Sequence, residues 1–206
     1  MEIDVLPLFS APVATGKIEV NHEHILDRLR TLKYNKTENN DNLEVIGSEI
    51  SDSLSVLDKL SSLEYHIKDF VNFYFNNILH YEPVNYEIVS SWATKTPMGT
   101  CGTRHTHPNS WISGVYYPDT LDSSIEFSKQ VPSNFYQPVK NNNILNSEKW
   151  YLPVVKGSIV LFPSNLSHRV TKNNSDRNRY SIAFNIFPTG TFGKHDSTLH
   201  INTIVS

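Results

Sequence analysis

The sequence predicts a mainly β fold, an antiparallel sandwich or barrel preceded by helices. Beyond Tyr86, short runs rich in β-branched and aromatic residues alternate with clusters of Pro, Gly, Asn and Asp, which is typical of closely spaced strands. Before Tyr86, apolar residues recur at helical spacing. A chain of 206 residues with 38% hydrophobic content has the size of one domain. We therefore expect a single domain, 1–206, with an arm and helical support over 1–85 and a β core over 86–206.

The first third of the chain supplies the support. Residues 3–13 predict an extended arm or a short edge strand, because two prolines interrupt an apolar run. Residues 21–33 carry leucines and isoleucines at helical spacing and predict a helix. Residues 34–53 predict a loop. The longest apolar stripe runs from Leu57 to Leu79 and predicts a helix laid across a sheet.

The β core is expected to contain short strands with one long connection. We expect strands 158–162 and 179–187 to pair as a hairpin with its tip at Lys172–Asn178. Residues 128–149 are polar, rich in Asn and Pro, and longer than a normal hairpin loop, so they are a candidate lid or substrate loop. The predicted strands are 86–94, 111–117, 125–127, 150–155, 158–162, 179–187 and 199–204.

Composition restricts the classes of partner. A net charge of −3 gives no field that would attract nucleic acid or an anionic membrane surface. The start of the chain lacks a basic region followed by an apolar core, and no run approaches the roughly 20 apolar residues of a membrane span. Cys101, the one cysteine, excludes an intrachain disulfide and suits a reducing compartment. These features predict a cytoplasmic protein.

Three histidines form a candidate metal site. His105 and His107 lie two residues apart before Pro108, at the end of a strand, so their imidazoles should leave from one face. Such a pair can occupy adjacent positions on a transition metal. His168 follows a similarly placed Pro-Ser turn and would complete an open, catalytic type of site. The other His-x-His pair, at His22, falls in a predicted helix, where the two side chains point about 200° apart.

An anion-binding pair accompanies these histidines. Arg179 and Ser181 lie two residues apart at the start of a predicted strand, so the guanidinium and the hydroxyl share one face. A guanidinium suits a carboxylate, to which it can donate two hydrogen bonds. Together with the histidines, the pair predicts a metal beside an anionic co-substrate.

Three segments carry a resemblance to a known family. HTHPNSWISGVYYP at 105–118, GSIVLFPSNLSHRV at 157–170 and RYSIAFN at 179–185 resemble, in this order, motifs of the 2-oxoglutarate and Fe(II)-dependent oxygenases. The likeness is closest to a small subgroup common in tailed phages and marine bacteria, which would place a phage-encoded chain in the host cytoplasm. It implies a double-stranded β-helix (jelly-roll) core, Fe(II) as the metal, and 2-oxoglutarate and O2 as co-substrates.

The resemblance also assigns roles to individual residues. His105 would be the proximal and His168 the distal metal ligand, while Arg179 and Ser181 would grip the far carboxylate of 2-oxoglutarate. The family's usual acidic ligand stands two residues after the proximal histidine, where this chain has His107. A three-histidine site would carry one more positive charge than the usual site, which should change metal preference and oxygen reactivity. We expect His107 to be the third ligand, with a role as a group beside the metal or in contact with substrate as the alternative.

Neither acid downstream of this motif is expected to replace the missing carboxylate. Asp119 and Glu126 lie beyond strand 111–117, which carries the chain about 20 Å away from the histidines. Trp92, Asn109, Ser113 and Tyr116 are candidates for lining the co-substrate or substrate pocket, with plain packing inside the barrel as the alternative. We expect three further arginines to be solvated charges: Arg104, Arg169 and Arg177.

The reaction implied by the family is hydroxylation of an unactivated C–H bond, with release of succinate and CO2. The substrate stays open among peptides, free amino acids, small metabolites and modified nucleobases. Three other classes compete. A cupin-type metalloprotein would need a glutamate shortly after the His-x-His, and a zinc hydrolase would need an Asp where Asn109 stands. The third is a non-catalytic β-helix that acts as a binding module.

Overall fold

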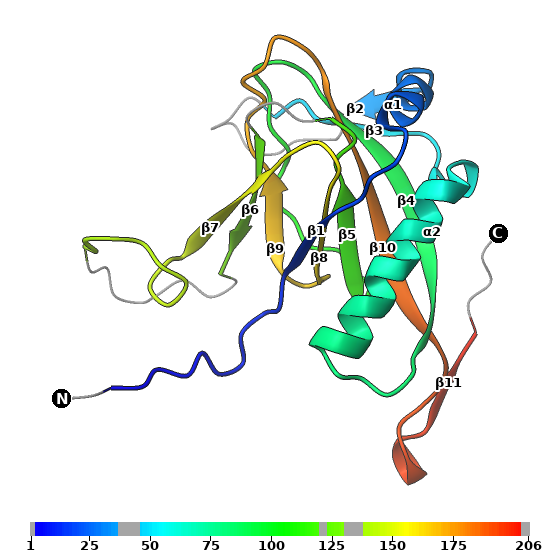
Figure 1. Ribbon diagram of the computed structural model, residues 1–206, viewed down its shortest axis with the longest axis vertical. Coiled ribbons are helices and arrows are strands. Elements are labelled where there is room, and N and C mark those ends of the chain that lie inside the picture. Colours follow the sequence, from blue (N-terminus) through cyan, green and yellow to red (C-terminus); the bar gives the residue numbers. More distant parts are fainter. Residues whose placement is uncertain (1–2, 37–45, 120–122, 130–137, 203–206) are drawn as a thin grey trace.

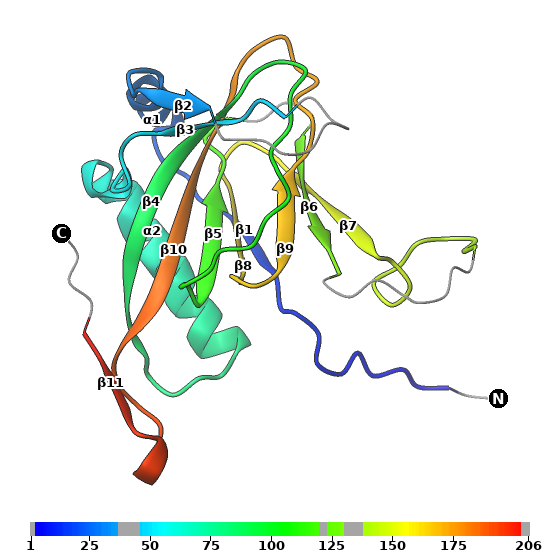
Figure 2. The ribbon, with the colours of Figure 1, turned by 180° about the vertical axis from the view of Figure 1, so that it is seen from behind.

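The computed structural model describes residues 3–36, 46–119, 123–129 and 138–202. They form two antiparallel sheets, with helices on the outer side of the larger one (Figures 1 and 2). The larger sheet contains β1 (Ala14–Lys17), β2 (Tyr34–Lys36), β3 (Glu49–Ser51), β4 (Asn85–Thr96), β5 (Ile112–Tyr116), β8 (Ser158–Pro163), β10 (Arg179–Phe192) and β11 (Leu199–Ile201). Its order is β1-β8-β5-β10-β4-β3-β2, and β11 pairs with β10. The smaller sheet has the order β7-β6-β9, with β6 (Ser123–Ser128), β7 (Lys149–Val154) and β9 (Ser167–Val170).

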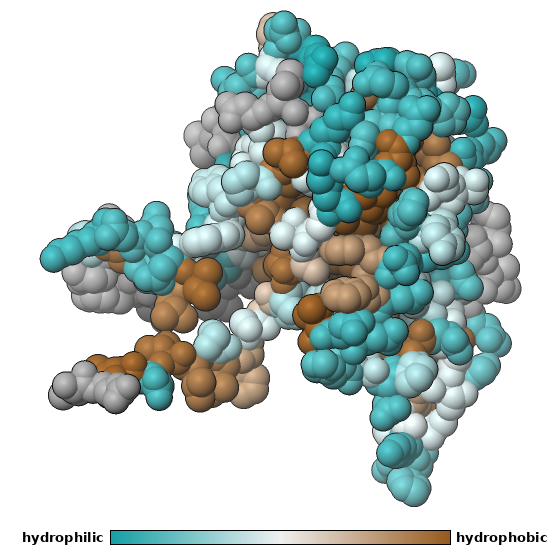
Figure 3. All heavy atoms as spheres, in the orientation of Figure 1, coloured by the Kyte–Doolittle hydropathy of each residue, from teal (hydrophilic) through white to brown (hydrophobic). Residues whose placement is uncertain are grey.

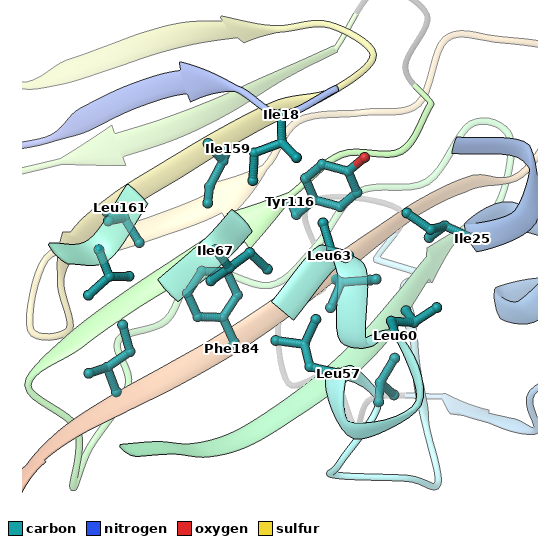
Figure 4. Packing of buried hydrophobic residues seen from close by; sticks show 14 of the residues in the cluster. Ile18, Ile25, Leu57, Leu60, Leu63, Ile67, Tyr116, Ile159, Leu161 and Phe184 are labelled. Atoms are coloured by element: carbon teal, nitrogen blue, oxygen red, sulfur yellow. The ribbon is translucent and has the colours of Figure 1, made fainter. Parts of the chain in front are cut away.

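The helical support packs on the larger sheet. Helix α2 (Ser61–Phe73) crosses the sheet and buries Leu63, Ile67 and Val71. These side chains lie four residues apart, so they form one stripe on the helix. They pack in the cluster that includes Tyr116 and Phe184 of the sheet (Figure 4), and each such burial stabilises the fold by about 2 kcal/mol. The remaining helical elements are α1 (His22–Arg30), a π-helical turn (Tyr74–Ile78) and 3₁₀ turns at Leu57–Lys59 and His195–Ser197.

A second apolar cluster fills the space between the two sheets. Val115 and Tyr117 contribute to it from the larger sheet, together with Ile125 and Phe127 from β6. Tyr116 belongs to the other cluster, under α2. Successive residues of a strand face opposite sides, so this single strand divides its side chains between the two cores.

For the N-terminal region, the structure overturns one expectation and decides between the two alternatives of another. Residues 34–53 were expected to be a loop, yet β2 and β3 pair there and extend the larger sheet through β4. Residues 3–13 form no strand; they are an extended arm, and pairing with β8 begins only at Ala14. Apolar side chains of the arm, among them Leu6 and Phe9, are exposed, and the arm projects from the body (Figure 3).

The expected hairpin between strands 158–162 and 179–187 is wrong. β5 lies between β8 and β10 and pairs with both. After β8 the chain turns at Pro163–Leu166 and enters β9 in the smaller sheet, where it pairs with β6. The two segments satisfy their backbone groups with other partners, so the sequence between them crosses from one sheet to the other.

Two further features of the fold concern the candidate lid and the helices. The candidate lid over 128–149 is described only in part, since 130–137 lie outside the described residues; 138–146 are exposed. In the described ranges, every helix is too short or too polar to cross a membrane.

Candidate active site

The structure brings the three predicted histidines together between the sheets. His168 lies on β9, and its backbone exchanges two hydrogen bonds of 3.0 Å with the backbone of His105. The backbone N–H of His107 donates to the carbonyl of Ser164, at 2.9 Å. One ligand atom from each imidazole lies within 4.8 Å of the others, and this is the one such group of potential ligands in the described part of the chain.

Hydrogen bonds orient two of the three rings. The Nδ1 of His105 lies 2.9 Å from the carbonyl oxygen of Thr103, and the Nδ1 of His168 lies 2.9 Å from that of Leu166. A carbonyl oxygen can only accept, so each Nδ1 carries the proton and donates it. The Nε2 lone pair of each ring is then free to bind a metal.

Burial keeps the inner histidines neutral. His168 is 3% exposed, and burial, with a smaller contribution from His105, lowers its pKa to about 3. Burial and the neighbouring His105 also lower the pKa of His107 to about 4. A neutral imidazole is the form that binds a metal, so both rings are ready ligands near neutral pH.

The geometry fits a transition-metal ion. The Nε2 atoms of His107 and His168 are 3.2 Å apart. Imidazole nitrogens bind such ions at about 2.0–2.1 Å, so a separation of roughly 3 Å is what two adjacent ligands on one ion require. Three histidines on one side leave the other positions open, as in catalytic sites.

The histidines open onto a cavity of about 350 Å³. Trp92 and Ser181, both predicted as site residues, line it, and the Trp92 ring lies 5.5 Å from that of His107. Most of the wall is apolar. The lining residues are Ser48, Ile50, Trp92, Thr94, Gly102, Thr103, His105, His107, Val115, Ile125, His168, Val170, Ser181 and Ala183.

Polar side chains gather one step beyond the lining residues. Arg179, Ser123 and Tyr117 each lie two residues along the same strand face from a lining residue. Arg179 is 5% exposed and donates to the hydroxyl of Ser123 and, at 2.8 Å, to the carbonyl of Thr171. The Tyr117 hydroxyl is buried and makes no hydrogen bond to the described residues. Burial raises its pKa, while the Arg179 charge acts in the opposite direction.

An orphaned hydroxyl beside a buried guanidinium suits an anion. Buried polar groups normally have a partner, and a carboxylate would accept from both Tyr117 and Arg179. Sequence reasoning overlooks Tyr117 and selects Tyr116 instead. Strand alternation is the signal that could have identified it, because Tyr117 shares a face with Ser113 and Val115.

Three predicted pocket residues do not line the cavity. Tyr116 faces the helical support, where its hydroxyl lies 2.6 Å from the Nδ1 of His22, the first residue of α1. Ser113 is on the inner face, but its hydroxyl is held by Ser164, at 2.8 Å, and by the side chain of Asn185. Asn109 is exposed in the turn after Pro108, with a φ of 56° that turns the chain toward β5.

The expectations for Glu126 and for two arginines are also wrong. Glu126 was expected about 20 Å away, but β6 pairs with β9, and Phe127 stands opposite His168. The Glu126 side chain leaves from the other face, where it is fully buried and accepts hydrogen bonds from Arg104 and Arg169. These two arginines are therefore not free solvated charges.

Asp119 also has a cationic partner. Its carboxylate pairs with the largely exposed Arg177, at 2.8 Å. Neither acid joins the group of potential metal ligands found in the described ranges. The distance argument given for Glu126 is wrong, because β6 returns the chain beside β9.

Comparison with known proteins points to one superfamily. Residues 90–185 match a family of 2OG-Fe(II) oxygenases. A prolyl-4-hydroxylase from Pseudomonas putida superposes with a TM-score of 0.52 and 14% identity, over 86% of this chain and 93% of that chain. A prolyl hydroxylase from Trichoplax adhaerens, in complex with a hypoxia inducible factor peptide, gives 0.57 and 12%, over 85% and 83%. HygX from Streptomyces hygroscopicus, with nickel and 2-oxoglutarate bound, gives 0.56 and 11%, over 87% and 84%.

At these identities the superpositions show the fold alone. They confirm the expected double-stranded β-helix, with its strands divided between two antiparallel sheets. No curated protein matches the chain in sequence.

Proposed function

We propose, from the match of residues 90–185 to a family of 2OG-Fe(II) oxygenases, that the chain hydroxylates a C–H bond at the site beside His105, His107 and His168. The enzyme is a 2-oxoglutarate-dependent dioxygenase, with Fe(II) and 2-oxoglutarate as cofactors and O2 as the second co-substrate. The balanced reaction converts substrate, 2-oxoglutarate and O2 into hydroxylated substrate, succinate and CO2. When bound, the metal with its co-substrate supplies the oxidising power for this step.

The residues of the chain would hold and orient these groups. His105, His107 and His168 would bind the metal through Nε2, with two of the rings fixed by their Nδ1–H bonds to carbonyl oxygens. Without an acidic ligand, the metal would carry the full charge of +2 before 2-oxoglutarate binds. A dianionic co-substrate would therefore be attracted more strongly than to a site with one carboxylate.

The far carboxylate of 2-oxoglutarate would lie at the inner end of the cavity. Arg179 would make a charge-assisted contact to it, and the hydroxyls of Ser181 and Tyr117 would add donors. The apolar wall around Val115 and Ile125 would exclude water, which strengthens these contacts. The observation that carries the proposal is this order of parts: three convergent imidazoles, a cavity, and a buried cation with an unpartnered hydroxyl behind it.

An anaerobic titration with Fe(II) and 2-oxoglutarate tests the proposal. The wild-type protein should develop the weak visible charge-transfer band of an iron chelate, and aerobic incubation should then release succinate. Retention of zinc with no band would instead favour a three-histidine hydrolase, and failure to bind any metal would favour a non-catalytic binding module.

Arg179→Ala tests the co-substrate site. This variant should bind iron with little change but lose 2-oxoglutarate turnover, because the far carboxylate loses its charged partner. Arg177→Ala is the matched control, since that side chain lies two residues away, is largely exposed and pairs with the carboxylate of Asp119. Normal succinate production by the Arg179 variant would remove the co-substrate assignment.

Three more detailed expectations from the sequence remain predictions. They are membership of the subgroup marked by the His-x-His-Pro-Asn-Ser motif, a cytoplasmic location, and the division of the chain at residues 85 and 86. The primary substrate is expected among peptides, amino acids and metabolites.

A further inference from the structure

Charged side chains next to the cavity beside the histidines point away from it in a regular pattern. Apart from histidines, no lining residue found in the described chain has an ionisable side chain. Yet five of the strands or segments that line the cavity carry a charged residue directly beside a lining one. Alternation along the backbone turns every one of these charges away from the cavity. The adjacent pairs are Glu49 and Ile50, Lys95 and Thr94, Arg104 and Thr103, Glu126 and Ile125, and Arg169 and His168.

The outward charges also neutralise one another. Lys95 pairs with Glu49 across β3 and β4. Glu126 pairs with both Arg104 and Arg169 on the outer face of β6 and β9. In the proposed site the +2 charge of the metal would be balanced by dianionic 2-oxoglutarate, so a further charged group entering the cavity would leave water without meeting an uncompensated opposite charge, which is strongly unfavourable. Arg179, at the inner end, is the exception, and the proposed function assigns it to 2-oxoglutarate.

Two side chains of the wall define what could be bound instead. Trp92 offers a large, partly exposed apolar surface beside His107. The hydroxyl of Thr103 is buried and has no hydrogen-bond partner within the described ranges. The Thr103 carbonyl already holds His105, so the hydroxyl next to it would place one hydrogen bond close to the metal ligands.

We propose, on the basis of the proposed function, that the part of the primary substrate entering this cavity is an uncharged, mostly apolar group with one hydrogen-bonding atom. Trp92 packs against the apolar part, and the Thr103 hydroxyl pairs with the polar atom. The size of the cavity sets a further limit. At about 350 Å³ it is at the small end of ligand pockets, and 2-oxoglutarate shares it. The reacting group is thus a small projection, such as a neutral side chain, and not a whole large ligand.

Pairs of probes that differ in charge but hardly in shape test this inference. One pair is N-acetyl-glutamine amide and N-acetyl-glutamate amide; the other is N-acetyl-norleucine amide and N-acetyl-lysine amide. The measurement is succinate release above the unstimulated rate, together with the change that each probe causes in the visible band of the iron chelate. The neutral member of each pair should act at a concentration at least about tenfold lower than its charged partner.

Variants separate the substrate site from the co-substrate site. Thr103→Val should weaken the response to N-acetyl-glutamine amide about tenfold, and the probe concentration that gives half of the response measures this effect separately from the dependence on 2-oxoglutarate concentration. Thr103→Ser keeps a hydroxyl and should restore the response. Equal or stronger action of the charged probes, or no response to any probe while unstimulated turnover persists, would overturn the inference. Absence of unstimulated turnover in the wild type would instead count against the proposed function.

Discussion

The two faces of the strands around β9 carry neighbouring residues in opposite electrostatic states. On the outer face, Arg104 and Arg169 surround the fully buried carboxylate of Glu126. On the inner face, His105 and His168, each one residue away, hold their rings next to an apolar cavity, and burial lowers the pKa of His168 so that its ring is neutral. Both faces depend on the same backbone pairing, because His105 bridges to His168 and β6 pairs with β9.

This difference separates structure from chemistry within one sheet. The outer cluster brings its own counter-charges, so its charges are balanced by the protein itself. Among the described residues, the inner cluster brings three imidazole nitrogens together and places an unpaired hydroxyl beside a guanidinium. Groups left incomplete by the fold are the ones that can bind a metal and a co-substrate.

The largest effect is expected at the inner face. His168→Gln removes a ligand at the centre of the cluster, so iron binding should be lost and succinate release should fall by more than about 100-fold. Iron content after anaerobic loading and dialysis checks the first expectation. His24→Gln, an exposed histidine of α1, is the control and should behave like the wild type. An iron-replete, active His168 variant would show that the metal lies elsewhere.

Substitutions on the outer face should lower the stability of the fold. Glu126→Gln leaves two arginines without their shared counter-charge, which should lower the free energy of unfolding by about 3 kcal/mol. Urea denaturation of the metal-free protein measures it. Glu64→Gln breaks a partly exposed pair with Lys68 on α2 and should cost less than about 0.5 kcal/mol. Similar losses in both variants would contradict a special role for the buried cluster.

The pH dependence of the stability should also report on the carboxylate of Glu126. Burial alone would raise the pKa of Glu126, but the hydrogen bonds and charges of Arg169 and Arg104 outweigh it, and the pKa lies below its usual 4.5. A lowered pKa contributes stability that is present above pH 4.5 and lost as the pH falls through the folded value. Wild type and Glu126→Gln should therefore converge in stability as the medium is acidified. A constant difference between them down to low pH would argue that lost packing, not lost charge, causes the defect.

The sequence predicted the chemistry of the site better than the path of the chain. His105, His107 and His168 were recognisable because their residue types and strand-end positions are independent of how the strands connect. The expected pairing of strands 158–162 and 179–187 was wrong because short apolar strands specify that they must pair, not with which partner. Long-range partners such as β5 and β6 follow from the closing of both cores at once, which no local pattern expresses.

The other feature that the sequence did not predict reliably is the face of the strand on which each side chain lies. Trp92 and Ser181 were placed correctly, whereas Tyr116 was chosen over Tyr117, and Glu126 was placed about 20 Å from the histidines. Both errors come from strand 111–117. A shift of one residue exchanges its two faces, and its exit into β6 returns the chain beside β9.

The smallest expected effects distinguish those two tyrosines. Tyr117→Phe should raise the KM for 2-oxoglutarate about tenfold, since a hydroxyl donating to a carboxylate is lost, and should leave stability unchanged or slightly higher because an unpaired buried hydroxyl is removed. Tyr116→Phe should do the reverse. It breaks the hydrogen bond to His22 and should cost about 1 kcal/mol of stability without changing the KM. Steady-state kinetics and urea denaturation of both variants provide the comparison. If the two substitutions had the same effects, the division of this strand between a structural face and a binding face would not hold.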